Sequence, residues 1–286
     1  MIYRGRIAPS PTGFLHLGHA ATFHTAWERA KNVAGQMILR VEDLDKARCR
    51  DEFRTAIYED LRWIGLDWDE GPDVGGRHAP YVQSKRMPLY REAFEILRRR
   101  GLVYPCRCSR REIRMALSAP HEGDEEPVYP GTCRPSRDPE QWHAEAVELN
   151  WRFRIPDGDE MNFTDANLGD QSVTCGRDFG DFLVWRRDNL PSYQLAVTVD
   201  DAEMGITEVV RGKDLIVSTF RQLLLYSALG HRPPNFFHCE LVCDQHGRRL
   251  AKRHTGSTLR HLRKAGCRPD ALHQLIGAQI DFEERA

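Results

Sequence analysis

The sequence predicts an α/β protein built on a parallel sheet, and two observations carry this prediction. First, a strand-like, a helix-like and a second strand-like stretch follow one another over residues 1–7, 18–35 and 36–43. Second, strand-like and helix-like segments return after a polar stretch that ends near Asn150. Strands that alternate with helices favour parallel pairing with right-handed crossovers.

The early elements each have a local signal. Residues 36–43, QMILRVED, have the apolar centre that is typical of a strand. Residues 50–65 are predicted to form a helix, because apolar side chains recur at helical spacing at Phe53, Ile57, Leu61 and Ile64. Residues 84–101 show the same spacing, and Gly65 and Gly101 are expected to end the two helices.

The middle of the chain is predicted to be an insertion, because it is polar, rich in proline and weakly periodic. Downstream we expect strands over residues 151–156, 181–189, 193–201 and 238–244, and a helix over 217–230. The predicted organisation has four parts: the first half of the main α/β domain at 1–101, the insertion at 102–150, the remainder of the insertion with the second half of the domain at 151–245, and a loop with a short helical segment at 246–286.

Composition limits the class of protein. The 286 residues carry a formal net charge of -1, which neither requires nor excludes a nucleic-acid partner. Most of the eight cysteines are isolated, so a disulfide framework is not expected. No stretch has the roughly 20 apolar residues of a membrane span, and no secretory signal begins the chain, so we expect a cytoplasmic protein with no membrane partner.

The turn RIAPSPTGFLHLGHA, Arg6 to Ala20, concentrates proline, glycine and histidine between a strand and a helix. A helix N-terminus carries unpaired N–H groups and a positive partial charge, which suit it to bind phosphates. Gly18 lets a nucleotide approach the backbone, and His16 and His19 can donate ring hydrogens to phosphate oxygens. The plain alternative is a turn whose histidines satisfy local hydrogen bonds. No G-x-G-x-x-G follows the first strand, which disfavours a dinucleotide-dependent oxidoreductase.

HLGH after PSPTG is the signature of the class I aminoacyl-tRNA synthetases, and the whole turn resembles their glutamyl branch. This resemblance implies a Rossmann-like catalytic fold and ATP with Mg2+ as reactants. It also implies that His16, Gly18 and His19 contact ATP and that both histidines act in catalysis.

The family's second signature, KMSKS, has a degraded counterpart in RLAKR, Arg249 to Arg253. The resemblance places Lys252 at the second family lysine and implies an ATP-binding and catalytic role for it, while Arg249 and Ala251 replace the usual lysine and serine. By charge patterning alone the stretch could equally be a solvated basic surface.

A site that selects glutamate needs cationic groups for two carboxylates and an acidic group for the ammonium. Arg6, Arg211 and Glu42 would supply this set, at positions that resemble the substrate contacts of glutamyl synthetases. The same resemblance adds five further contacts: Ile7, Ala8, Pro9, Ser10 and Tyr193. Which arginine binds which carboxylate stays open. The plain alternatives are that Glu42 caps the next segment, Arg211 pairs with Asp214 and Tyr193 packs in the core.

Cysteines form one ligand-like group, in the insertion. Cys106, Cys108 and Cys133 can occupy three corners of a tetrahedral zinc site that would staple a segment poor in apolar residues. The resemblance implies Tyr129 as the fourth ligand of one structural Zn2+, whereas ordinary zinc chemistry would sooner suggest His121 or His143. The competing interpretation is three buried thiols.

Only residues 253–286 follow Lys252, so we expect no anticodon-binding domain. This length resembles a short branch of the glutamyl family, which attaches glutamate to queuosine in the anticodon of tRNA(Asp). The expected partners are L-glutamate, ATP and tRNA(Asp) carrying queuosine, and the chain is expected to be a monomer. Two alternatives remain: a glutamyl-tRNA synthetase, or a fragment of one, that charges the tRNA 3' end, and a non-catalytic zinc-containing RNA-binding module.

Overall fold

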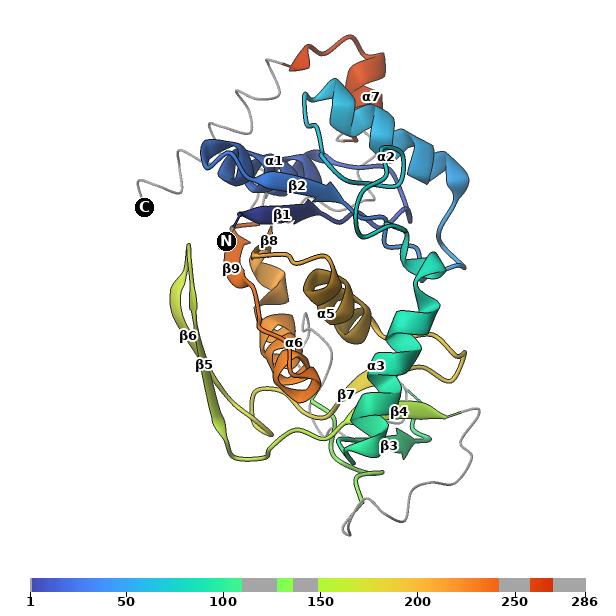
Figure 1. Cartoon of the computed structure of the whole chain (residues 1–286), viewed down its shortest axis with the longest axis vertical. Helices are drawn as coiled ribbons and strands as arrows, with labels where there is room; N and C mark the ends of the chain where they lie inside the picture. The colour runs from blue at the N-terminus through green and yellow to red at the C-terminus, as the bar shows by residue number, and fades with distance from the viewer. Residues whose placement is uncertain (1, 110–127, 136–148, 242–257, 270–286) are drawn as a thin grey trace. The chain divides into compact units, whose positions relative to one another are not determined.

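The computed structural model describes residues 2–109, 128–135, 149–241 and 258–269. The chain divides into two compact units (Figure 1). The first unit comprises Met1–Arg86, Met204–Leu215 and Pro234–Ala286, and the second comprises Met87–Glu203 and Ile216–Pro233. Among the helices that the structure describes, none has the length and apolar character needed to cross a membrane.

The first unit is built on parallel strands, as predicted. β1 (Arg4–Ile7) pairs in parallel with β2 (Gln36–Leu39), and β8 (Glu208–Gly212) pairs in parallel with β9 (Asn235–Cys239). The N–H of Thr207 donates to the carbonyl of Arg4 at 2.9 Å, which places the start of β8 beside β1. The carboxyl ends of parallel neighbours lie at one edge, where α/β proteins commonly bind ligands.

Helices of the first unit cover these strands. α1 (Leu17–Asn32) contacts β1, β2 and β8, and its small buried residues let the helix approach the strands closely. α2 (Asp51–Trp63) adds Ile57 and Leu61 to the same core, and α7 (Leu259–Lys264) adds the fully buried Leu259. Two short 3-10 helices, η1 (Gln83–Lys85) and η3 (Lys213–Leu215), complete the described elements of this unit.

The described part of the second unit combines three helices with antiparallel strands (Figure 1). The helices α3 (Met87–Arg99), α5 (Tyr193–Glu203) and α6 (Ile216–Leu229) pack against one another. A three-stranded antiparallel sheet has the order β3 (Val103–Cys106), β4 (Asn150–Phe153) and β7 (Phe182–Trp185). The remaining pair, β5 (Glu160–Asp165) and β6 (Gly169–Thr174), forms a two-stranded antiparallel ribbon.

One predicted element has the wrong type. Residues 193–201, expected to be a strand, form most of α5. The β-branched run from Val197 to Val199 suggested a strand, but α5 contacts α3 and α6 and is buried on nearly all sides. A helix buried all round shows no amphipathic period, so packing and not periodicity decides its structure. The buried Asp200 at its end accepts from the Tyr90 hydroxyl at 2.9 Å.

Most other predicted elements are confirmed with small shifts. The helices expected at 50–65 and 84–101 are α2 and α3, and the glycines expected to end them, at 65 and 101, have φ angles of 79° and 67°, where glycine is favoured. The strand expected at 238–244 is β9, which begins earlier and ends at Cys239.

Candidate active site

The HLGH turn begins α1 with a reciprocal histidine cap. The Gly18 N–H donates to His16 Nδ1 at 3.1 Å, and the His16 N–H donates to His19 Nδ1 at 3.3 Å. The two ring centroids lie 3.8 Å apart. Because each ring accepts through Nδ1, its neutral form carries the proton on Nε2. The structure thus shows the local hydrogen bonds of both histidines. These bonds use Nδ1, so in the neutral rings Nε2 is the nitrogen that carries a proton.

The chain that follows the RLAKR stretch returns to this turn. The Leu259 N–H donates to the Leu15 carbonyl at 2.8 Å, and Thr258 forms a β-bridge with His16. Thr258 also caps α7, because its hydroxyl accepts from the His261 N–H at 3.3 Å. Lys252 itself lies outside the described residues. The structure thus places Thr258 and Leu259, which follow Lys252 in the chain, beside the HLGH turn.

α7 is held on α2 by charge. Arg260 Nη1 lies 2.8 Å from Glu52 Oε1, and Arg263 Nη2 lies 2.7 Å from Glu59 Oε2. Arg263 also approaches the fully buried Asp60 at 3.4 Å. Burial raises the pKa of the Asp60 carboxyl to about 6, against the opposing field of Arg263.

Two of the predicted glutamate contacts, Arg6 and Glu42, lie near the carboxyl ends of β1 and β2. The buried Arg6 donates through Nη1 to the Val210 carbonyl at 3.0 Å, and the Glu42 N–H donates to the Pro9 carbonyl at 3.0 Å. Glu42 Oε1 accepts from Arg40 Nε at 3.3 Å and from Arg40 Nη2 at 3.0 Å. Arg40 is fully buried, so it fixes the Glu42 carboxylate from the protein side.

The second predicted arginine lies on the next strand pair of the same unit. Arg211, on β8, is buried, and its Nε donates to Nε2 of His238 on β9 at 3.2 Å. The guanidinium carbon also lies 5.4 Å from the ring centroid of Phe236. Backbone pairing and side-chain contacts therefore place both arginines and Glu42 in one unit, where the parallel strands end.

The remaining predicted glutamate contacts divide between the units. Ile7 and Pro9 are buried, Ala8 is half-buried and Ser10 is exposed in the first unit. Tyr193 is the first residue of α5 in the second unit. Its side chain is 40% exposed, so the alternative that it packs in the core is wrong.

The structure also brings the predicted metal ligands together. The sulfurs of Cys106, Cys108 and Cys133 all lie within 4.8 Å of one another. Tyr129 Oη lies 3.4 Å from the Cys106 sulfur and 3.6 Å from the Cys108 sulfur, and the Cys108 and Cys133 sulfurs are 3.5 Å apart. Zinc–sulfur bonds of about 2.3 Å in a tetrahedron separate two sulfurs by about 3.7 Å. The four donor atoms are therefore spaced for one tetrahedral ion, while His121 and His143 lie outside the described residues.

The surroundings shift the pKa values of Cys108, Tyr129 and Cys133 in different directions. Burial raises the pKa of the Cys108 thiol to about 11, and burial with hydrogen bonds to the cysteines also raises the pKa of Tyr129. At Cys133 burial is opposed and outweighed by hydrogen bonds, chiefly from Tyr129 and the Arg107 N–H, which lower its pKa to about 7. The buried Arg152 lies with its guanidinium carbon 3.8 Å from the Tyr129 ring centroid and donates to the Cys106 sulfur at 3.3 Å.

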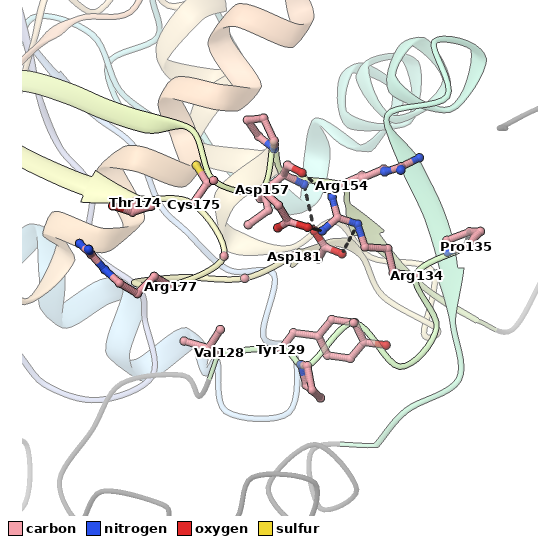
Figure 2. A pocket seen from close by; sticks show the side chains of 17 residues that line it. Val128, Tyr129, Arg134, Pro135, Arg154, Asp157, Thr174, Cys175, Arg177 and Asp181 are labelled. Carbon is pink, nitrogen blue, oxygen red and sulfur yellow. Dashed lines mark hydrogen bonds and ion pairs between the residues drawn. The ribbon is translucent and has the colours of Figure 1, made fainter. Parts of the chain in front are cut away.

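A groove of about 1220 Å³ opens beside Tyr129 in the second unit (Figure 2). Figure 2 shows Arg134 between Asp157 and Asp181, and its Nε lies 3.5 Å from an Asp181 oxygen. Arg154 and Arg177 also line the groove. None of the residues predicted to bind ATP or glutamate is among its lining residues.

Three side chains of these clusters were not predicted from the sequence. Arg40 precedes Glu42 by two residues in the strand-like QMILRVED, so alternation along an extended chain could have indicated that the two side chains share a face. Arg152 and His238 gave no comparable signal. Each acts on a residue of another strand or loop, and only the pairing register reveals that contact.

Comparisons with known proteins agree with this geometry. The family described as tRNA synthetases class I (E and Q), catalytic domain, matches residues 3–279. The chain is 48% identical to a glutamyl-Q tRNA(Asp) synthetase of Nitratidesulfovibrio vulgaris, over 99% of this chain and 89% of that protein. It is 50% identical to a glutamyl-Q tRNA(Asp) synthetase of Symbiobacterium thermophilum, over 94% of this chain and 83% of that protein.

A solved structure shares the fold. The glutamate-tRNA synthetase from Elizabethkingia anophelis superposes with a TM-score of 0.78 at 34% identity and covers 88% of this chain. This chain matches 53% of that protein, so it spans about half the length of the solved relative.

Proposed function

The chain belongs to the class I tRNA synthetases of the glutamate and glutamine type, and we propose that it activates L-glutamate with ATP and transfers the glutamyl group to queuosine in the anticodon of tRNA(Asp). The observation that carries the proposal is the position of the HLGH cap, Arg6, Glu42 and Arg211 in one unit, where its parallel strands end. The 48% and 50% identical relatives, each matched over more than four-fifths of its length, support the choice of acceptor.

Adenylate formation is the first step. An oxygen of the glutamate α-carboxylate attacks the α-phosphorus of ATP, and the bond to the β-phosphate oxygen breaks to release pyrophosphate. His16 and His19 would donate from Nε2 to phosphate oxygens at the N-terminus of α1, where the helix dipole favours negative charge. Lys252 would follow the phosphates with a flexible ammonium, and Mg2+ bound with ATP supplies further neutralisation of the phosphate charge.

Glutamate is held by opposite charges. Arg6 and Arg211 would bind its two carboxylates, and Glu42, fixed by Arg40, would accept from its ammonium. The backbone of Ile7, Ala8 and Pro9 with Ser10 would border this site, and Tyr193 would add a polar contact.

Transfer completes the reaction. A hydroxyl of queuosine attacks the acyl carbon of glutamyl-adenylate, AMP leaves, and the hydroxyl proton passes to solvent. Alignment and donors aimed at developing charge supply the acceleration, and no protein nucleophile takes part.

The insertion would have a structural role. The spacing of Cys106, Cys108, Cys133 and Tyr129 fits one Zn2+, which would fix residues that are far apart in the chain. The proposed organisation is the first half of the catalytic domain at 1–101, a zinc-binding insertion at 102–150, the remainder of the insertion with the second half of the catalytic domain at 151–245, and a KMSKS-like loop with a short helical segment at 246–286.

The test is transfer of labelled glutamate to three RNAs. The proposal expects labelling of tRNA(Asp) that carries queuosine, and also of its isolated anticodon stem-loop, which has no 3' acceptor end. It expects no labelling of tRNA(Asp) that carries guanosine instead. Equal labelling of both forms of tRNA(Asp), or charging of tRNA(Glu), would contradict the acceptor. An enzyme without glutamate-dependent exchange of pyrophosphate into ATP would contradict the activation step itself.

A further inference from the structure

His238 faces Arg211 across the β8–β9 pair. The two residues are register partners in parallel strands, so their side chains share a face of the sheet. His238 is 0% exposed and Arg211 is 5% exposed, and Arg211 Nε lies 3.2 Å from His238 Nε2. This is a hydrogen bond between buried groups, where solvent does not compete.

The direction of the hydrogen bond fixes the state of the imidazole. A guanidinium has donors only, so Nε2 of His238 must be the acceptor and carries no proton. The ring is then neutral, with its proton on Nδ1. A neutral acceptor holds Arg211 without cancelling its charge, whereas a carboxylate in the same place would form an internal ion pair and compete with an anionic substrate.

A second contact restricts the same guanidinium. Its carbon lies 5.4 Å from the centroid of the Phe236 ring, and Phe236 and His238 stack at 6.1 Å between centroids with 15° between their planes. An arginine side chain has many rotamers. The hydrogen bond at Nε and the neighbouring aromatic ring together allow only a few of them. The two Nη nitrogens lie at the other end of the planar fork from the Nε hydrogen bond.

We propose that His238 is a positioning residue, which orients Arg211 through a neutral Nε2 acceptor so that the guanidinium meets a glutamate carboxylate in a fixed geometry. The inference deepens the proposed function and rests on it, because it takes Arg211 as a substrate-binding residue. His238 contacts the arginine and not the substrate, and its effect is on glutamate affinity.

A matched pair of substitutions tests the acceptor. In His238→Gln the amide oxygen can reach the former position of Nε2, whereas in His238→Asn it reaches only that of Nδ1. In glutamate-dependent ATP–pyrophosphate exchange, His238→Asn should raise the KM for glutamate about 10- to 100-fold, as expected for loss of a hydrogen bond to a charged group. The KM for ATP should change less than about twofold, and His238→Gln should restore most of the glutamate KM. Equal glutamate KM values for the two variants would overturn the proposal.

The energetic coupling between substitutions at His238 and Arg211 tests this inference separately from the proposed function. Lysine has no Nε–H, so in an Arg211→Lys background His238→Asn should have no additional effect on the glutamate KM. Full additivity would overturn the positioning role while leaving Arg211 as a ligand. An Arg211→Ala enzyme with unchanged glutamate KM would instead contradict the proposed substrate site. The exposed His231, changed to Asn, serves as the control and should leave both KM values unchanged.

A measurement on the unmodified enzyme applies even where variants fold poorly. Nitrogen-15 NMR should show His238 as the Nδ1–H tautomer at neutral pH, with Nε2 unprotonated. A protonated Nε2 would overturn the proposal, because that atom could not accept from Arg211.

Discussion

The two units stabilise their polar clusters by different means. In the first unit three polar contacts join groups of complementary chemistry: the histidines of the HLGH turn cap each other, Arg40 donates to Glu42, and Arg211 donates to His238. In the second unit three thiols and a phenol cluster: the three sulfurs lie within 4.8 Å of one another, and the phenol oxygen of Tyr129 lies 3.4 Å and 3.6 Å from two of them. The described contacts of the first unit join protein groups to each other, whereas the cysteine cluster of the second has the composition of a metal site.

Because of this difference, we expect the stability of the second unit, but not that of the first, to depend on a bound metal. Protonated thiols are weak hydrogen-bond partners, and ionised ones in this cluster would repel each other. A divalent cation removes both problems, since it binds thiolates and favours ionisation of a phenol. The apolar support of the cluster is small: Tyr104, Cys106 and Tyr129 form its buried group, with Cys108 and Cys133 packed against them. Metal removal should therefore affect the second unit and spare the first.

The largest expected effect is loss of the metal. Cys108→Ser should abolish stoichiometric zinc binding and destabilise the insertion, because structural zinc contributes on the order of 10 kcal/mol to folding of small zinc domains. Tyr129→Phe should weaken binding more mildly and let water serve as fourth ligand. Elemental analysis and thermal unfolding of both variants measure this, and glutamate-dependent pyrophosphate exchange should largely survive.

Two results would break the comparison. Freshly purified protein without zinc, or Cys108→Ser protein that retains it fully, would return these cysteines to the buried-thiol interpretation. Exchange activity that disappears together with the metal would show that the two clusters depend on each other.

The next largest effect is expected at Lys252, in the predicted KMSKS-like loop. Lys252→Ala should lower the rate of adenylate formation about 10²- to 10³-fold, the usual loss for one donor to transition-state charge. The KM for glutamate should change little, because the ammonium is proposed to act on phosphate. Single-turnover kinetics of adenylate formation measure the rate. Lys252→Arg, which keeps the charge, is the matched control, and unchanged kinetics in Lys252→Ala would remove this lysine from the mechanism.

Arg6→Ala should have a smaller effect, confined to glutamate. Loss of the guanidinium leaves a substrate carboxylate without its partner. The kcat/KM for glutamate should therefore fall roughly 30-fold, which corresponds to a loss of about 2 kcal/mol of transition-state stabilisation. Arg6→Lys should recover part of this loss through its charge. The control is Arg48→Ala, whose guanidinium pairs with Asp45 at an exposed position. Wild-type glutamate kinetics in Arg6→Ala would place the substrate carboxylates elsewhere.

The sequence predicted some residues of the two clusters and missed others. Residues that are proposed to contact a ligand have recognisable types at fixed spacing, and His16, His19, Cys106, Cys108 and Cys133 were predicted in this way. The structure confirms the proximity of the histidines to each other, and that of the three cysteines to Tyr129.

Residues that act on other residues were not found. Arg152 reaches the cysteine cluster from β4, and His238 reaches Arg211 from β9, through contacts set by strand pairing. The same limit explains α5, whose β-branched residues resemble a strand until its helical neighbours are known. A local sequence pattern predicts an element or a ligand residue where local chemistry determines it. The pattern fails where tertiary packing determines the structure.

The smallest expected effect is a pH-dependent one at Asp60, a buried carboxyl of the first unit. Asp60 is fully buried on α2, neither of its carboxylate oxygens has a hydrogen-bond partner among the described residues, and Arg263 on α7 remains 3.4 Å away. Burial raises its folded-state pKa from 3.8 to about 6. The unfolded state therefore gives up this proton more readily, so the ionised carboxylate lowers stability above about pH 6, and the loss disappears as the pH falls below about 4.

Asp60→Asn should consequently stabilise the protein at neutral pH. A shift of about two pKa units corresponds to roughly 3 kcal/mol, and burial of the unpartnered amide offsets part of this, which leaves a gain of about 1 kcal/mol at pH 7.5. At pH 4 the wild-type carboxyl is largely protonated in the folded state, so mainly the cost of burying the amide remains, and the substitution should destabilise the protein by about 1 to 2 kcal/mol. Glu59→Gln, on the same helix and also beside Arg263, is the control: its carboxylate is about half exposed, so its effect should stay below about 0.5 kcal/mol at both pH values. The free energy of unfolding, measured with denaturant at the two pH values, tests this prediction. An Asp60→Asn effect of equal size at pH 7.5 and pH 4 would show that the charge of the carboxylate does not cause the destabilisation.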